Sequence, residues 1–259
     1  MSLNQRCAIM STWPPGVRRS KGDDRVDEKT IAGLLGLLAH DLRNPLSALH
    51  SNMGFLAVAS DIGQAEIGEV VADALVSCDG LLAIIDNIEI LSQSMTDPSP
   101  RAAGHVSVAS TVAQTVAANH ALAKSHEVAV QIDPSAQDTT LTVWVNRDMY
   151  RRALANVLRN AIQHSAGKAV RLVAQHLDDR VQVLVIDQGS RLDATLGDEP
   201  FTAAGQLSAK NKAGARYGRG LGLYCARFAA TTAGAELSAA ESPAGSGNAF
   251  VLTAPINAP

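Results

Sequence analysis

Aromatic residues are scarce in this sequence, which limits the kind of core that it can build. Phe, Trp and Tyr make up 3% of the 259 residues, whereas hydrophobic residues as a class make up 46%. The core must therefore consist mainly of Leu, Val, Ile and Ala. The chain is long enough for one large domain or two ordinary ones.

Cysteines and long apolar runs are scarce as well. Cys7, Cys78 and Cys225 are odd in number and lack metal-ligand spacing, a pattern typical of a reduced intracellular protein. The longest apolar run, near Ile31–Ala39, is far shorter than the ~20 residues of a membrane helix, and no signal peptide is visible. We therefore expect a soluble, cytoplasmic protein with no membrane partner.

Neither sign of charge is in excess. The chain has 22 Lys and Arg residues against 25 Asp and Glu residues. This balance gives no electrostatic basis for binding nucleic acid or an anionic membrane surface. We expect no nucleic-acid partner.

One histidine in the first part of the chain stands out because of its position on a predicted helix. Apolar residues recur at positions 31, 35, 38, 42, 46, 49, 53 and 56, which predicts a helix over Asp27–Ala59 with one packed seam. His40 lies about 200° from the seam position two residues before it, and so faces away from the seam. Pro45 cannot donate a hydrogen bond to the carbonyl of Asp41, so the helix should kink beside His40. This pattern indicates an imidazole kept accessible for chemistry, although an ordinary surface histidine is the plainer alternative.

A second helix is predicted from Ala65 to about Ser94, after a short polar turn. Its apolar positions 67, 71, 74, 78, 81, 85 and 88 keep a strict four-three spacing. Such a hairpin cannot bury both seams alone, so we expect two copies of the chain to form a dimeric four-helix bundle. An intramolecular bundle is less favoured because no later segment supplies two more long seam helices.

The predicted secondary structure changes after the hairpin, from long helices to a mixture of strands and helices. We expect a flexible leader at residues 1–26, the hairpin at 27–96, a linker at 97–104 and a second domain at 105–259. In that domain, strands are predicted at 105–108, 127–132, 141–145, 170–177, 181–187, 236–240 and 249–254, and helices at 110–124, 147–165 and 221–233. Residues 190–217 lack a clear period. Strands and helices in this irregular order indicate an α+β fold.

The predicted helix at 147–165 carries polar residues at one-turn steps. Arg152, Asn156, Asn160 and His164 share the face opposite its apolar side. Asn is a poor residue in the middle of a helix, so two at this spacing suggest that their amides are needed. An ordinary solvated face is the alternative.

Glycine-containing turns follow two of the predicted strands and precede the last predicted helix. Asp187-Gln188-Gly189 ends an apolar strand and presents a carboxylate next to a glycine, although a plain β-turn has the same pattern. The run Gly218–Leu223 opens a helix and exposes N–H groups that suit phosphate, but its spacing is neither of the standard nucleotide fingerprints. Gly245–Asn248 precedes the last strand and reads as a turn.

Together and in this order, these motifs resemble those of the sensor histidine kinases of two-component systems, over residues 27–257. Six segments carry the resemblance, and in chain order they match the phosphoacceptor motif, the N box, the first glycine box, the lid motif, the second glycine box and a third glycine-rich turn. These segments are His40–Leu46, Asn156–Ala161, Asp187–Gly189, Glu199–Phe201, Gly218–Leu223 and Gly245–Gly247. The resemblance implies a dimerisation and phosphotransfer hairpin, followed by a Bergerat-type ATP-binding domain with an α/β-sandwich fold.

The resemblance also implies an activity, that of an ATP-dependent protein-histidine kinase. His40 would accept the γ-phosphoryl group of ATP, and Asp41 would orient its imidazole and take up its proton. The phosphoryl group would then pass to an aspartate of a response regulator. Asn44 matches the residue that orients water for dephosphorylation of that regulator.

For the nucleotide site, the resemblance implies ATP and Mg²⁺ as cofactors. Asn160 would hold Mg²⁺, with Asn156 and Arg152 nearby, Asp187 would accept from the adenine amino group and His164 would stack on adenine. The remaining implied nucleotide contacts are Gly189, Gly218, Gly220, Leu221 and Gly222.

The sequence departs from the family pattern at a few positions. Arg191 replaces the second glycine of the first glycine box, and would either narrow the nucleotide pocket or reach phosphate. Gln163 occupies a position that is commonly Lys. In the lid, Lys210, Lys212 and Arg216 are candidate phosphate contacts.

These departures leave a second function open, that of a non-catalytic phosphotransfer or pseudokinase module with a degenerate ATP site. Retention of Asn160, Asp187 and the Gly218–Leu223 run favours the active kinase. We also expect the stimulus to come from a separate sensor protein, the leader or a ligand of the core.

Overall fold

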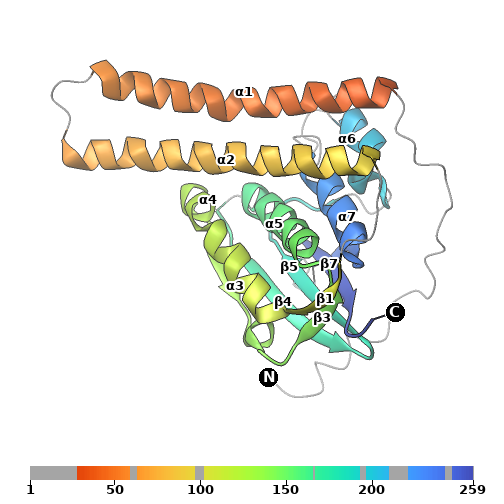
Figure 1. The fold of residues 1–259 in the computed structure, drawn as a ribbon. Coiled ribbons are helices and arrows are strands. Elements are labelled where there is room, and N and C mark those ends of the chain that lie inside the picture. Colours follow the sequence, from red (N-terminus) through yellow and green to blue (C-terminus); the bar gives the residue numbers. More distant parts are fainter. Residues whose placement is uncertain are drawn as a thin grey trace.

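A computed structural model describes residues 28–58, 63–96, 102–165, 167–192, 197–209, 221–242 and 247–258. Two long antiparallel helices, α1 (Glu28–Val58) and α2 (Gln64–Thr96), lie across one end of an α/β unit (Figure 1). The predicted helical hairpin is confirmed, and α1 runs as one helix through Pro45. Within the described ranges, no helix has both the length and the hydropathy to span a membrane.

The α/β unit contains a five-stranded sheet in the order β2-β4-β5-β7-β6. β2 runs parallel to β4, and the other neighbours are antiparallel. The predicted strands at 170–177 and 181–187 are confirmed as the antiparallel pair β4–β5, and those at 236–240 and 249–254 as the antiparallel pair β6–β7. The strand bounds are Val130–Ile132 for β2, Val170–Leu177 for β4, Arg180–Ile186 for β5, Glu236–Glu241 for β6 and Asn248–Pro255 for β7.

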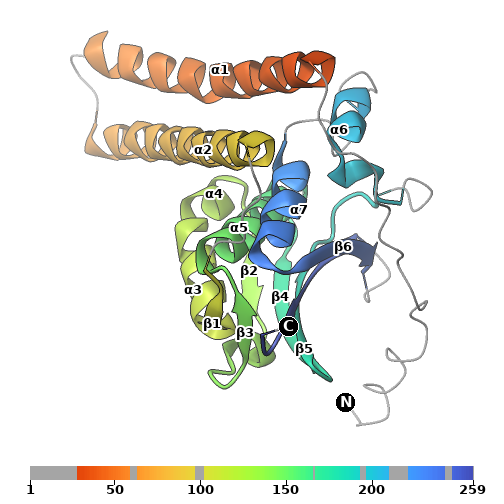
Figure 2. The same cartoon turned by 45° about the vertical axis from the view of Figure 1, so that its right-hand side comes forward.

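A smaller sheet and a layer of helices complete this unit. β1 (Gly104–Ser107) pairs antiparallel with β3 (Thr142–Val145). The helices pack over one face of the large sheet, between the sheet and the hairpin (Figure 2). They are α3 (Val108–Ala118), α4 (His120–Ser125), α5 (Arg147–His164) and α7 (Gly222–Ala233). The result is the predicted α+β architecture.

Two local predictions in this unit were wrong. The single helix expected at 110–124 is two helices, because the chain breaks at Asn119, whose side-chain amide donates to the carbonyl of Thr115 over 2.8 Å. The strand expected from 127 begins at Val130, since Glu127 has a left-handed φ of 54°. The aperiodic stretch 190–217 contains the 3₁₀ turn η5 (Glu199–Phe201) and α6 (Ala203–Ala209), and a second 3₁₀ turn, η3, spans Pro134–Gln137.

The hairpin buries a stripe that overlaps the predicted seam only at Leu38. Leu34, Leu37 and Leu38 of α1, with Ile90 and Leu91 of α2, join one core cluster with the α/β unit. Seven seam residues are exposed in the single chain, with solvent-exposed fractions of 37–56% at Leu35, Leu46, Met53, Ile67, Val71, Ile85 and Ile88. Sequence periodicity had not revealed that the α/β unit covers part of the hairpin.

Candidate active site

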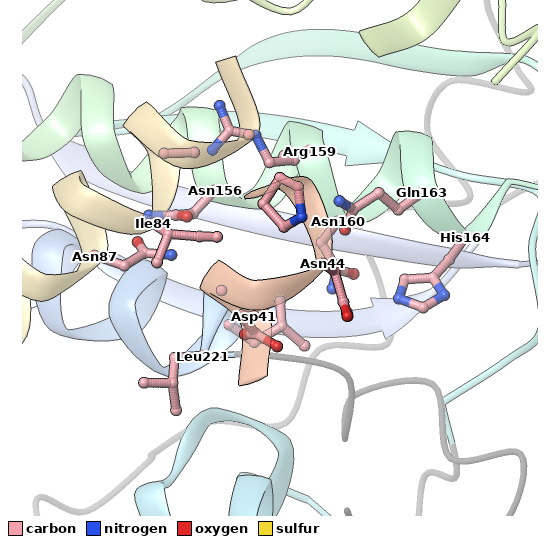
Figure 3. Close-up of a pocket in the computed structure, with 15 residues that line it drawn as sticks. Asp41, Asn44, Ile84, Asn87, Asn156, Arg159, Asn160, Gln163, His164 and Leu221 are labelled. Carbon is pink, nitrogen blue, oxygen red and sulfur yellow. The ribbon is translucent and has the colours of Figure 1, made fainter. Parts of the chain in front are cut away.

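Helix α5 presents the polar residues that the sequence singled out. The Asn146 side chain caps the helix by accepting from the Met149 N–H over 3.0 Å, which satisfies one of the unpaired amides of its first turn. The apolar side of α5, including Leu154 and Leu158, is fully buried against the core. This packing fixes the opposite face, with Asn156 and Asn160, toward the hairpin (Figure 3).

A cleft of about 300 Å³ lies between the hairpin and the ends of α5 and α7 (Figure 3). It brings together seven of the residues predicted for the site, from three separate parts of the chain. They are Asp41 and Asn44 from α1, Asn156, Asn160 and His164 from α5, and Leu221 and Gly222 from the start of α7. The hairpin and the α/β unit therefore share one cavity, in which the two sets of predicted functional groups face each other.

Asn160 has the chemistry expected of a cation ligand. Its Oδ1 is buried and has no hydrogen-bond partner, an arrangement that costs free energy unless a ligand satisfies the oxygen. Carboxamide oxygens are acceptable ligands for Mg²⁺, which often takes one or two protein ligands and completes its shell with phosphates and water. The described residues contain no cluster of three or more His, Cys, Asp or Glu that could hold a metal on its own. The site thus fits a magnesium ion that arrives with a nucleotide.

His40 lies beside this cleft rather than in it. Its side chain is 59% exposed, that of Asp41 is 19% exposed, and the Nδ1 of His40 is 3.5 Å from Oδ1 of Asp41. Asp41 lines the cleft and His40 does not. The prediction that the imidazole of His40 is accessible is confirmed.

Asp187 is held rigidly at the end of β5. Its side chain is fully buried, and Oδ1 accepts from the Gly189 N–H over 2.9 Å and from Nδ2 of Asn248 over 3.3 Å. Asn248 also accepts from the Leu192 N–H over 2.7 Å. Asp187 and Gly189 do not line the cleft, so the predicted adenine end of the site lies outside it.

Sequence analysis missed Asn248, although it had marked the turn in front of it. Gly247 has a φ of 80°, and a Cβ there would lie 2.0 Å from the carbonyl oxygen of Asp187. The glycine lets β7 approach Asp187 closely enough for Asn248 to reach the carboxylate. The sequence signal that could have revealed this role is the pair Gly247-Asn248 at the start of a predicted strand.

Several other predicted residues do not lie in the cleft. Arg152, expected near the phosphates, instead forms ion pairs with Glu89 over 2.6 Å and Asp86 over 3.5 Å. Arg191 is exposed. The remaining candidates, Gly218, Gly220, Lys210, Lys212 and Arg216, lie outside the described residues, as do Gly245 and residues 97–101 of the linker.

Comparison with known proteins shows which proteins this chain is similar to. Residues 145–258 match the family model described as histidine kinase-, DNA gyrase B- and HSP90-like ATPase. The chain is 28% identical over 207 residues to the sensor-type histidine kinase PrrB of Mycobacterium leprae, across 80% of this chain and 44% of that protein. It is 27% identical over 206 residues to a bacteriophytochrome of Pseudomonas aeruginosa, across 78% of this chain and 26% of that protein. The chain therefore spans less than half the length of these relatives.

Solved structures show the same fold at low sequence identity. The Acinetobacter baumannii histidine kinase AdeS superposes with a TM-score of 0.55 and 15% identity, over 85% of this chain and 98% of that chain. Full-length ShkA in complex with AMPPNP gives a TM-score of 0.54 and 20% identity, over 87% of this chain and 46% of that chain. The match extends over both the helical hairpin and the α/β unit.

Proposed function

We propose that this chain is a sensor histidine kinase of the two-component type, which uses ATP and Mg²⁺ to phosphorylate His40. The phosphoryl group then passes to an aspartate of a response regulator, and Asn44 assists the dephosphorylation of that regulator. The observation that carries this proposal is the shared cleft, where Asp41 and Asn44 of the hairpin face Asn156 and Asn160 of the ATPase domain.

The geometry of His40 favours Nε2 as the nucleophile. Its Nδ1 lies toward Asp41 at 3.5 Å, so the Nδ1 proton faces the carboxylate and Nε2 keeps its lone pair. A bond forms between Nε2 and the γ-phosphorus while the bond from that phosphorus to the β,γ-bridging oxygen breaks. ADP leaves with this electron pair, and Asp41 takes up the Nδ1 proton.

The ATPase domain contributes binding and charge neutralisation. The buried carboxylate of Asp187 accepts from the adenine amino group, and its bonds from Gly189 and Asn248 fix the direction of that acceptor. Asn160, with its unsatisfied oxygen, holds Mg²⁺. Magnesium neutralises phosphate charge in such transfers, which depend mainly on positioning.

Transfer also requires a movement of the first helix. His40 lies next to Asp41 but outside the cleft, and adjacent helical residues are about 100° apart around the axis. A turn of α1 by about that angle brings the imidazole to the place that Asp41 occupies. Asp41 then remains close enough to accept the proton.

A homodimer is part of this proposal. The exposed apolar residues of the predicted seam, such as Leu46, Met53 and Val71, run along α1 and α2 away from the α/β unit. A second copy that packs on this stripe would remove it from water and form a four-helix bundle.

We place the protein in the cytoplasm, where ATP is available and where the free thiols of Cys78 and Cys225 remain reduced.

Incubation of the purified protein with γ-labelled ATP and Mg²⁺ tests the function. We expect acid-labile label on the wild type, none on His40→Ala and none on Asn160→Asp. His50→Ala is the matched control, because His50 is an exposed histidine on the same helix that does not line the cleft. Nucleotide binding without label, together with label transferred from a phosphorylated partner, would instead indicate the non-catalytic phosphotransfer module.

A further inference from the structure

The cleft contains a single arginine, Arg159, whose guanidinium forms no ion pair within the part of the chain that the structure describes. Arg159 lies on α5 between Asn156 and Asn160 and is the one Arg or Lys among the described residues that line the cleft. Figure 3 shows it on the side of the helix that faces α2. It forms no hydrogen bond or ion pair with any described residue, whereas Arg152, two turns earlier, is paired with Asp86 and Glu89.

The environment of Arg159 makes an anion favourable at this position. Desolvation lowers its pKa from the ordinary value, and the more distant charges of Asp86 and Asp79 oppose that effect. A guanidinium nevertheless stays protonated in proteins, so the group carries a partly dehydrated positive charge. Such a charge costs free energy until an anion satisfies it.

The hairpin contributes a second unsatisfied group to the same cavity. Asn87 of α2 is only 9% exposed, lines the cleft, and has a buried Oδ1 with no hydrogen-bond partner. Its backbone carbonyl accepts from the thiol of Cys225 over 3.7 Å, which ties this turn of α2 to α7. The carboxamide is thus held at the cavity wall with spare hydrogen-bonding capacity.

We propose that Arg159 and Asn87 form the binding subsite for the phosphoryl group that ATP transfers, an inference that rests on the function proposed above. The planar guanidinium donates two N–H groups to phosphoryl oxygens. The Asn87 carboxamide supplies one further donor and an acceptor for the water that accompanies the phosphate. Both residues contact the substrate directly.

This subsite links nucleotide binding to the docking of the two domains. Asn87 belongs to the hairpin and Arg159 to the ATPase domain, so a terminal phosphate between them holds the domains together. ADP has no such group and does not bridge them. Because coupling between binding and docking is reciprocal, the hairpin residue must raise the affinity for ATP over that for ADP.

Calorimetric titration of the full chain with a non-hydrolysable ATP analogue and with ADP, both with Mg²⁺, tests the subsite. We expect Arg159→Gln to weaken binding of the analogue about 10- to 100-fold, as for loss of a charged hydrogen bond. Asn87→Leu should weaken it roughly 2- to 10-fold. ADP binding should change little in either variant, and labelling of His40 should slow in both.

Two control variants separate the subsite from general effects on charge and folding. Arg147→Gln removes the same charge from the exposed start of α5. Gln93→Met removes a half-buried side chain of α2 whose amide oxygen is buried without a hydrogen-bond partner and which does not line the cleft. Both should keep the wild-type ratio of analogue to ADP affinity, and thermal unfolding of all four variants reports their folding.

The possible results have distinct meanings. An unchanged affinity ratio and labelling rate in folded Arg159→Gln and Asn87→Leu would overturn the subsite and leave the kinase function standing. An equal loss of analogue and ADP affinity would also overturn it, since that pattern indicates a structural role. A wild type that binds no nucleotide would overturn the proposed function and the subsite together.

Discussion

Arg152 of α5 and Glu89 of α2 form an ion pair with 2.6 Å between the guanidinium Nη2 and Oε2. The same nitrogen is 3.5 Å from Asp86, and Nη1 donates to the backbone carbonyl of Asp86 over 3.4 Å. Arg152 is the more buried partner, with 18% of its side chain exposed against 52% for Glu89. The pair joins the ATPase domain to the hairpin next to Asn87, and so helps to hold the two walls of the cleft together.

Loss of this ion pair should loosen the contact between the domains. We expect Arg152→Gln to speed amide hydrogen exchange in the part of α2 around Asp86, by roughly the two- to fivefold that a partly exposed ion pair of up to about 1 kcal/mol allows. Glu89→Gln should have a smaller effect, because Asp86 remains. Arg151→Gln is the control, because Arg151 lies one residue away and makes no ion pair with described residues. Unchanged exchange in Arg152→Gln would show that apolar packing alone holds the hairpin.

The adenine end of the site should respond differently from the phosphate end. Asn248→Ala removes hydrogen bonds to Asp187, Ser190 and Leu192, and each unsatisfied buried group costs about 1–3 kcal/mol. We expect the affinities for ATP and ADP to fall by the same factor, roughly tenfold, because both nucleotides carry adenine. Titration calorimetry measures this, and a selective loss of ATP binding would contradict the assignment of Asp187 to adenine.

Gly247 should tolerate no side chain. Gly247→Ala would place a methyl group 2.0 Å from the carbonyl oxygen of Asp187 at a φ of 80°, so the backbone must shift. Left-handed strain alone costs about 1–2 kcal/mol, and the displacement of Asn248 should add loss of nucleotide affinity. Chemical denaturation measures the first effect. Gly68→Ala is the control, since a Cβ there meets nothing within 4 Å in α2, and it should stabilise the helix by about 1 kcal/mol.

Acid should remove a small stabilising contribution from Asp133. The Ser135 N–H and hydroxyl, then Arg171, lower the pKa of its carboxyl. A lowered pKa in the folded state stabilises the fold above the unfolded pKa of about 3.9. That contribution is lost as the pH falls through the lower folded value. Denaturation of the wild type and Asp133→Asn should therefore differ at neutral pH and converge below roughly pH 3, and a constant difference across this range would contradict the assignment.

The sequence predicted best the elements in which the hydrophobic pattern repeats over many residues. The bounds of α5 and of the β4–β5 hairpin lie within a residue or two of the prediction, because each has a full amphipathic or alternating pattern. Helix α6 has only 7 residues, which is too short for a period to show. The motifs that carry chemistry were found because their spacing along one helix or turn is itself the signal.

Relationships between distant residues were not predictable in the same way. Leu34 and Leu37 pack into the core of the α/β unit. They lie next to seam positions on the same helix, so the apolar pattern alone does not show which of these residues are buried. Arg152 binds acids 63 and 66 residues earlier in the chain, and Asn248 reaches a carboxylate 61 residues away. Only the fold brings these groups together, since no local pattern encodes such partners.

The position of the phosphoryl group on His40 tests the account most directly. Phosphorus NMR of the wild type after reaction with ATP and Mg²⁺, compared with His40→Ala, identifies the nitrogen that carries it. The contact of Nδ1 with Asp41 predicts one Nε2-phosphohistidine signal, which is absent from the variant. A signal from Nδ1-phosphohistidine, or a wild-type signal that persists in His40→Ala, would contradict the account.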